Sequence, residues 1–493
     1  MDYLDPKQQS RHQIILFVGY GCIAIAIAIA TLVLVYQAYG FGLDRKGTVI
    51  QNGLTFFSSQ PNPATITVNG VVSKSKTNSR LVLPENIYQV VLSRDGYRNW
   101  ERTIQVDGGS VRHFDYPMLF PKTLTTKKID TFSAAPGVAT QSPDRRWLMT
   151  QQAGSITSFN SYDLKNPTKA ATAVTVPDTV LSKPTTGQES WRFSEWADDN
   201  VHLVLEHVYD DKSEYVLINR ENPEQSINLN TTISGTFTKL TLNNRKFDQY
   251  YVHDTASGAL QTASLQLTTP TALLPQVLAY KSYGDNTVLY ASTADSPAGK
   301  VVIRLRVGDK TYDLRTLPAG TTYLLDLTKY DNNLYVVLGA SSQNKLFIYK
   351  DPIGQLVNEE RHSLSPAQVL HVVAPNYLSF SSSAQYIVAE NGTQFGVYDI
   401  ENEKGYNYTA KQPLDAPAAH ATWMDGNRLT YVSGGKMTVF DYDYTNHQSL
   451  MAASSTYLSA YAPDYKFIYA LTPGSGAGQF DLMQTSLNST ADQ

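Results

Sequence analysis

The chain has 493 residues and a formal net charge of −4, from 40 Lys and Arg against 44 Asp and Glu. This balance provides no basic face for a phosphate backbone, so the composition excludes a nucleic-acid-binding protein. The single cysteine, Cys22, rules out an intramolecular disulfide, and a chain of this length has room for about two or three domains that must be stabilised by packing alone.

The first predicted element is an apolar helix at Ile14–Tyr36, within a stretch from Gln13 to Leu43 that contains no charged residue. At a rise of about 1.5 Å per residue, about 23 apolar residues extend roughly 34 Å, enough to cross a hydrocarbon core of about 30 Å. The alternative is a signal peptide cleaved near Ala38–Gly40, but signal h-regions contain only about 7–15 residues. We therefore expect one uncleaved transmembrane helix at residues 13–37.

The orientation of this span does not follow from the flanking charges. Lys7 and Arg11 before the helix are balanced by Arg45 and Lys46 after it, so the positive-inside rule favours neither side. The tail of residues 1–12 is too short to fold, whereas the remainder of the chain is large. We therefore expect a protein of the cell membrane with a cytoplasmic N-terminus and extracytoplasmic C-terminal domains.

Beyond the apolar helix the composition favours strands. The chain contains 32 Tyr, a residue enriched in sheets, and no later segment keeps a helical apolar period over three turns. In residues 47–120, short alternating runs are separated by turn residues, and Thr65–Val68 is followed by Asn69-Gly70, a strong hairpin signal. Six or seven such strands in about 70 residues predict a small β-sandwich.

Within this region the residues resemble the PEGA domain of bacterial surface proteins. The resemblance lies in an ordered set of segments, namely Ser58–Pro61, Ala64–Gly70, Leu83–Val90, Gly96–Trp100, the strand at Val106, and Leu119. The chain departs from the family pattern at Asn86, where glycine is usual, but Asn is the non-glycine residue that best tolerates a left-handed backbone. The resemblance implies a sandwich module near the cell envelope, without catalytic residues.

Beyond Phe120 one local pattern recurs, a polar turn followed by an alternating apolar strand. The sequence contains eight copies, at Ser142–Leu148, Trp196–Leu203, Asn243–Phe247, Gly284–Tyr290, Tyr330–Tyr335, Ser381–Tyr386, Trp423–Leu429 and Ala462–Ile468. Their spacing of about 39–55 residues is the size of a four-stranded propeller blade, and the turn fits the hairpin between its first and second strands. The Ser-Pro-Asp form resembles the repeats of exported TolB-like and WD40-like propellers, a resemblance that carries no activity.

The eighth copy leaves only about 30 residues before the end of the sequence, too few for a complete blade. Lys122–Phe132 is a strand-like run just before the first copy, and its addition to the last blade would remove an open sheet edge. The sequence thus predicts an all-β region behind the transmembrane helix. It consists of the PEGA-like β-sandwich at 47–120, an eight-bladed β-propeller at 122–487, with seven blades as the alternative, and a polar tail at 488–493.

Few residues indicate a ligand site. His371 and His420 precede the sixth and seventh turns, on strands expected to line the central channel, so both are candidate binding residues. Asp441–Thr445 begins like a calcium loop, but Ala452 stands where the bidentate glutamate should be. The sequence contains no HExxH motif, nucleophile elbow or Cys/His cluster. We therefore expect no metal, no cofactor and no catalytic residue.

These features predict a non-catalytic envelope protein, in which a membrane anchor and a small module carry a propeller that binds an envelope protein or a glycan. The alternative is a propeller-type enzyme acting on extracellular polysaccharide, with carboxylates from different blades gathered at the channel. Side chains that form such a site would be dispersed over the repeats, so the sequence leaves both functions open.

Overall fold

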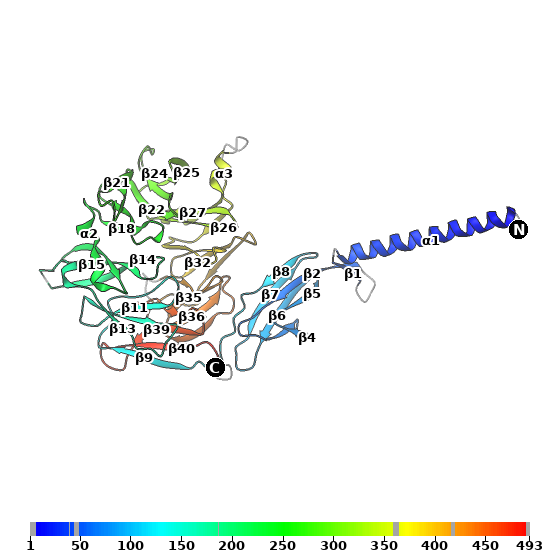
Figure 1. Cartoon of the computed structure of the whole chain (residues 1–493), viewed down its shortest axis with the longest axis horizontal. Helices are drawn as coiled ribbons and strands as arrows, with labels where there is room; N and C mark the ends of the chain where they lie inside the picture. Colours follow the sequence, from blue (N-terminus) through cyan, green and yellow to red (C-terminus); the bar gives the residue numbers. More distant parts are fainter. Residues whose placement is uncertain are drawn as a thin grey trace. The chain divides into compact units, whose positions relative to one another are not determined.

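The computed structural model describes residues 6–38, 40–43, 49–185, 187–357, 364–415 and 420–489 (Figure 1). The chain divides into two compact units, one ending at Thr123 and the other beginning at Leu124. The start of the predicted N-terminal tail, the flanking Arg45 and Lys46, and the end of the predicted polar C-terminal tail lie outside the described residues.

Helix α1 spans Pro6–Ala38, so the helix begins within the segment predicted to be a tail. From Ser10 to Gln37 it has 28 residues with a mean hydropathy of 2.5, and none of this stretch is buried. Exposed apolar surface costs roughly 25 cal/mol per Å² in water, and Phe17 is 80% exposed. Helix α1 therefore fits a membrane anchor or a signal sequence.

A small β-sandwich follows the helix. One sheet contains β1 (Phe41–Leu43), β2 (Val49–Phe57), β5 (Ser79–Pro84) and β8 (Val111–Phe114), and the other contains β4 (Val71–Lys76), β3 (Thr65–Val68), β6 (Asn86–Ser93) and β7 (Trp100–Val106). Its core packs Phe57, Ile66, Val90, Trp100 and Ile104, each at most 3% exposed. The sandwich predicted from the alternating runs is confirmed.

The sequence predicted a particular backbone conformation at two turns of the sandwich, at Asn69-Gly70 and at Asn86. Asn69 and Gly70 have φ of 47° and 78°, the left-handed pair that a tight β3–β4 hairpin requires. Asn86 was expected to replace a left-handed glycine, but it is not among the residues with positive φ. It begins β6, and its side-chain oxygen accepts a hydrogen bond from the Ile87 N–H at 2.8 Å. The substitution of glycine therefore requires no left-handed backbone here.

The second unit is a β-propeller whose described residues form eight four-stranded sheets, numbered 1 to 8 in chain order. Sheets 1 and 2 contain β10 (Ala139–Gln141), β11 (Trp147–Gln151), β12 (Ser158–Asp163) and β13 (Thr172–Thr175), then β14 (Glu189–Trp196), β15 (His202–Tyr209), β16 (Lys212–Asn219) and β17 (Ile227–Asn228). Sheets 3 and 4 contain β18 (Lys239–Leu242), β19 (Gln249–Asp254), β20 (Ala259–Ser264) and β21 (Thr271–Leu274), then β22 (Val277–Tyr283), β23 (Thr287–Ser292), β24 (Lys300–Val307) and β25 (Lys310–Pro318).

The later sheets follow the same order. Sheets 5 and 6 contain β26 (Tyr323–Tyr330), β27 (Asn333–Ala340), β28 (Lys345–Lys350) and β29 (Gln368–His371), then β30 (Tyr377–Phe380), β31 (Tyr386–Glu390), β32 (Gln394–Asp399) and β33 (Lys404–Thr409). Sheets 7 and 8 contain β34 (Thr422–Trp423), β35 (Arg428–Ser433), β36 (Lys436–Asp441) and β37 (Gln448–Ala452), then β38 (Ala460–Tyr461), β39 (Phe467–Pro473), β40 (Phe480–Ser486) and β9 (Thr126–Phe132). Short helices α2 (Leu229–Thr232) and α3 (Pro352–Val357) and four 3-10 turns lie in the connections.

The repeated turns found in the sequence occupy one equivalent position. Each joins the first and second strands of its sheet, as predicted. Several reverse the chain through a residue with left-handed backbone, with φ of 62° at Arg145, 60° at Asn200, 61° at Asn332 and 60° at Ala384. Asn200 and Asn332 suit this conformation, whereas the turn residues Asp144, Asp199 and Asp425 accept hydrogen bonds from backbone N–H groups of the turn.

Sheet 8 is completed by a strand from the other end of the propeller sequence. Strand β9 pairs antiparallel with β40, from Phe132 opposite Phe480 to Thr126 opposite Thr485, and Figure 1 shows the two strands side by side. This is the segment that the sequence analysis assigned to the last blade. Sheets 8 and 1 also share a core cluster, and the Gln141 Nε2 donates to the Tyr461 carbonyl at 2.7 Å.

Candidate functional site

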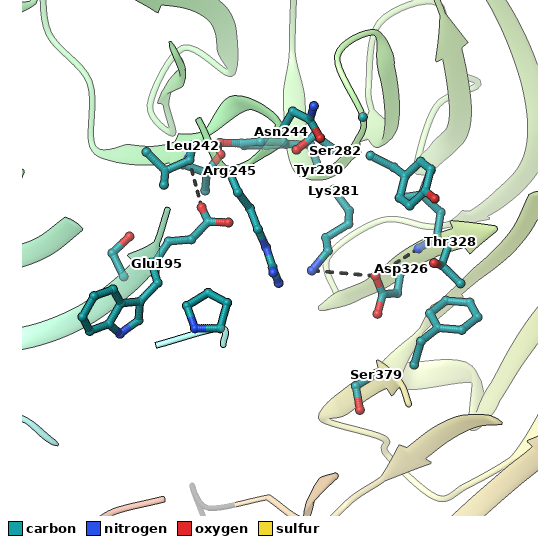
Figure 2. A pocket seen from close by; sticks show the side chains of 18 of the residues that line it. Glu195, Leu242, Asn244, Arg245, Tyr280, Lys281, Ser282, Asp326, Thr328 and Ser379 are labelled. Carbon is teal, nitrogen blue, oxygen red and sulfur yellow. Dashed lines mark hydrogen bonds and ion pairs between the residues drawn. The ribbon is translucent and has the colours of Figure 1, made fainter. Parts of the chain in front are cut away.

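The central channel of the propeller contains a cavity of about 1060 Å³. Residues of the first strand or first turn of sheets 1 to 6 line it, which identifies these first strands as the inner strands. The charged lining residues are Glu195, Lys239, Arg245, Lys281 and Asp326, and the aromatic ones are Phe193, Trp196, Tyr280, Tyr283, Tyr377 and Phe380. Figure 2 shows the side chains of Glu195, Arg245, Lys281 and Asp326 converging on a common space.

Glu195 reaches this space because of an irregularity in β14. The pairing of β14 with β15 shifts between Phe193 and Glu195, so one extra residue bends the strand and redirects its side chains. The Leu242 N–H donates to Glu195 Oε2 at 3.0 Å (Figure 2). Burial raises the pKa of Glu195, and the hydrogen bond from Leu242 and the charges of Arg245 and Lys281 only partly oppose this rise.

Lys281 and Asp326 connect the inner strands of sheets 4 and 5. Lys281 Nζ lies 3.7 Å from Asp326 Oδ1, and the Leu327 N–H donates to the same oxygen at 3.0 Å. The side chain of Asp326 is 13% exposed and that of Lys281 is 54% exposed. Burial raises the pKa of Asp326, against the opposing effect of Lys281. The ammonium group of Lys281 is thus open to the cavity although a carboxylate is near.

Lys239 and Tyr280 form the adjoining part of the wall. The Lys239 Nζ lies 5.3 Å from the centroid of the Tyr280 ring, within the range of a cation–π contact. The Tyr280 and Thr241 hydroxyl groups are 2.9 Å apart and join β22 to β18. Burial lowers the pKa of Lys239, and the charge of Lys281 lowers it further.

The two histidines predicted from the sequence have different positions. His371 ends β29, the fourth strand of sheet 5, and its side chain is exposed. The expectation that it lines the channel is wrong, because the first strand of sheet 6 begins only at Tyr377. His420 lies just before β34 and stacks on Tyr377 with ring centroids 3.5 Å apart, so it contacts a residue that lines the cavity but is not itself among the lining residues.

The sequence analysis missed the five charged lining residues. Each lies on an inner strand or first turn, and Glu195, Lys239, Lys281 and Asp326 all precede a repeated turn by a few positions. An alignment of the eight repeats on their turns would have placed these residues on the first strands, although it would not have shown that their side chains meet. Among the described residues, no group of three His, Cys, Asp or Glu side chains is arranged to hold a metal ion. The candidate site is therefore a polar and aromatic cavity with charges of both signs.

A comparison with family models bears on the small β-sandwich. Residues 54–119 match the family model of the PEGA domain, which confirms the resemblance found in the sequence. No curated protein matches the chain. The chain is thus an all-β protein with an apolar N-terminal helix, a PEGA domain and a β-propeller.

Several solved propeller structures are similar to the chain. An oligogalacturonate lyase in complex with manganese is 10% identical, with 75% of this chain and 100% of that chain covered and a TM-score of 0.42. The Dos1 propeller is 13% identical, with 74% and 96% covered and a TM-score of 0.46. Hsv2 of Kluyveromyces lactis is 10% identical, with 66% and 98% covered and a TM-score of 0.39.

Proposed function

We propose that the protein is a non-catalytic binding protein of the cell envelope, anchored by α1 with its N-terminus in the cytoplasm. The PEGA domain and the propeller then lie outside the membrane, and the propeller binds a glycan or a protein of the envelope in its channel. The anchor is supported by the exposed apolar surface of α1, and the envelope location by the PEGA match.

The observation that carries the proposed binding function is the composition of the cavity wall. Six aromatic and five charged side chains from separate sheets line a single space of about 1060 Å³, a volume at the upper end of those typical of ligand pockets. Phe193 is 46% exposed, which leaves its ring free for a ligand. Aromatic faces beside hydrogen-bonding groups suit the apolar ring faces and the hydroxyl groups of sugars, so a glycan is the favoured ligand.

A panel of envelope glycans and envelope proteins, presented to the full-length protein in detergent micelles, tests this function. Phe193→Ala should weaken binding of the ligand that is found by about tenfold, the effect of removing a stacked ring. Leu267→Ala removes a comparably exposed apolar side chain, 56% exposed on the β20–β21 connection, and should change nothing. Equal loss in both variants, or binding to no member of the panel, would refute a channel-binding function.

One observation favours the enzymatic alternative. Glu195 and Asp326 both line the cavity, and burial raises the pKa of each, as expected for a general acid. Arg245 and Lys281 act on Glu195, and Lys281 also pairs with Asp326, so cations accompany both carboxylates. Release of reducing ends from envelope polysaccharides by the wild type, abolished in Glu195→Gln, would establish an enzyme in place of a binding protein.

A further inference from the structure

Two lysines from adjacent sheets share one wall of the channel. Lys239 is the first residue of β18 in sheet 3, and Lys281 lies within β22 in sheet 4. Both line the cavity, and the charge of Lys281 acts on Lys239. Two like charges that face the same cavity destabilise each other. The wall therefore favours any ligand group that removes the repulsion.

The carboxylates of the channel leave these two cations poorly neutralised. Lys281 Nζ is 3.7 Å from Asp326 Oδ1, longer than the roughly 2.7–2.9 Å of a charge-assisted hydrogen bond. The same oxygen already accepts the Leu327 N–H. Lys239 lies over the face of Tyr280, and within the described part of the chain no ion pair joins it to a carboxylate. A second acceptor at this wall would satisfy both ammonium groups.

We propose that Lys239, Lys281 and Tyr280 form a subsite for an anionic group carried by a carbohydrate polymer, namely the carboxylate of an acidic sugar or the phosphate of a polyol-phosphate chain. This inference rests on the proposed function and specifies its ligand. Both groups present several oxygens, so one anion accepts from both lysines. The Tyr280 ring, whose hydroxyl group is fixed by Thr241, holds the ammonium group of Lys239 over its face. The exposed Phe193 in the same cavity offers an apolar face to the neighbouring carbohydrate.

Calorimetric titration of the full-length protein in detergent micelles at low salt tests this subsite. The probes are trigalacturonate, a hexamer of glycerol phosphate, uncharged maltotriose and hexaglutamate. We expect binding of trigalacturonate or of the glycerol phosphate hexamer, and the one that binds identifies the anion as carboxylate or phosphate. Added salt should weaken the binding, because these contacts are between charges.

Matched variants assign the binding to this wall. Lys239→Met and Lys281→Met keep the length of the side chain and remove the charge, so each should weaken binding of the anionic probe by about tenfold. Lys239→Arg should retain it. Lys310→Met removes an exposed lysine at the β24–β25 hairpin and serves as the control. Equal melting temperatures of all variants would show that folding is unaffected.

The outcomes separate this inference from the proposed function. Binding of an anionic probe that is unchanged in Lys239→Met and Lys281→Met, or binding of maltotriose alone, overturns the subsite and leaves a glycan-binding channel. Binding of hexaglutamate but of no carbohydrate overturns the carbohydrate ligand and favours a protein partner. Binding of no probe overturns the anionic subsite, and the wider panel described above then decides the proposed function.

Discussion

Lys281 Nζ and Asp326 Oδ1 lie 3.7 Å apart and connect the inner strands of two neighbouring sheets within the channel. The lysine side chain is about half exposed, whereas the aspartate is mostly buried. The pair therefore restrains a cation at the edge of the cavity without removing it from solvent. A single substitution at Asp326 would therefore change the net charge of the channel.

Asp326→Asn should strengthen anion binding in the channel. The amide oxygen can still accept the Leu327 N–H, but the charge that competes for Lys281 is lost. We expect an increase in affinity of about two- to fivefold, the usual value of a partly exposed ion pair. Asp309→Asn, in a fully exposed turn, is the matched control. Weaker binding of the anionic probe by Asp326→Asn would contradict the proposed role of Lys281.

The buried carboxyl group of Glu390 should make the folded protein less stable at neutral pH than at acid pH. It is fully buried at the end of β31, and the Ala421 N–H donates to its Oε1 at 2.6 Å. Burial raises the pKa of Glu390 from 4.5 to about 7, so its protonated form is favoured in the folded state. Its contribution to stability is complete below pH 4.5 and is lost as the pH rises to about 7, a change of about 3 kcal/mol.

Glu390→Gln should abolish this dependence, because the amide is neutral at every pH and still accepts from Ala421. Denaturant unfolding between pH 4.5 and 8 measures the effect. We expect the variant to be more stable than the wild type above pH 7 and similar near pH 4.5. Parallel curves for the two proteins over this range would show that Glu390 does not titrate in it.

The buried cluster around His207 should have the opposite effect, so that the protein loses stability as the pH falls below 4.5. His207 Nδ1 lies 2.9 Å from Glu214 and its Nε2 lies 3.0 Å from Glu189. Burial alone would raise the pKa of Glu214, but hydrogen bonds from His207, Ser182 and Asn228 outweigh it and lower this pKa to about 2. The stabilisation is complete above pH 4.5 and is lost as the pH falls to about 2.

Glu214→Gln should therefore lower the free energy of unfolding by about 3 kcal/mol at pH 7. The difference from the wild type should shrink as the pH approaches 2. Glu224→Gln, at an exposed carboxylate in the turn Pro223–Gln225, controls for a change of net charge and should cost less than about 0.5 kcal/mol. An unchanged melting temperature for Glu214→Gln at pH 7 would show that the cluster does not stabilise the fold.

Strand β9 should decide the stability of the propeller. We expect the fragment starting at Lys122 to fold alone, because a unit of this size has its own cores. A fragment starting at Ser133 lacks β9, exposes the edge of β40 and should aggregate or melt at a clearly lower temperature. Equal melting temperatures for the two fragments would show that the ring does not need β9.

A point substitution within β9 provides a milder test. Phe132 is 4% exposed in the cluster shared by sheets 8 and 1, so Phe132→Ala should cost about 3–5 kcal/mol. Lys127→Ala, at an exposed position of the same strand, should cost less than about 0.5 kcal/mol. Similar losses in both variants would indicate that the strand is held by backbone pairing rather than by its core contact.

The proposed topology is tested with thiol labelling in intact cells. Cys22 lies within α1 and is the single cysteine of the chain, so a membrane-impermeant reagent should not reach it. A cysteine introduced by Lys74→Cys, at an exposed position of β4, should react. Reaction of position 74 only after lysis would place the PEGA domain in the cytoplasm.

Much of the architecture was predictable because it depends on local backbone chemistry. Asn69-Gly70 gave a hairpin, and residues such as Asn200 and Asn332 marked the turns of the propeller, since each tolerates a left-handed backbone wherever it occurs. The partner of β40 was predictable because Lys122–Phe132 was an unassigned run with strand character.

The channel was not predictable in the same way. Lys281 and Asp326 are 45 positions apart in the sequence and meet only because their strands occupy equivalent inner positions of adjacent sheets. Glu195 depends on a bulge that leaves no mark in the residue pattern. His371 was misplaced because a fourth strand and the next first strand are close in sequence but lie at opposite edges of neighbouring sheets.

The pairing of β9 with β40 also has a mechanical consequence. Any tension between the N-terminal helix and a ligand held by the propeller passes along the chain through Thr123 and reaches the propeller first at β9. The hydrogen bonds between β9 and β40 and the core contacts of Phe132 therefore carry this force before the contacts of any other strand. The same strand that completes the last sheet therefore sets the force at which an anchored propeller would begin to open.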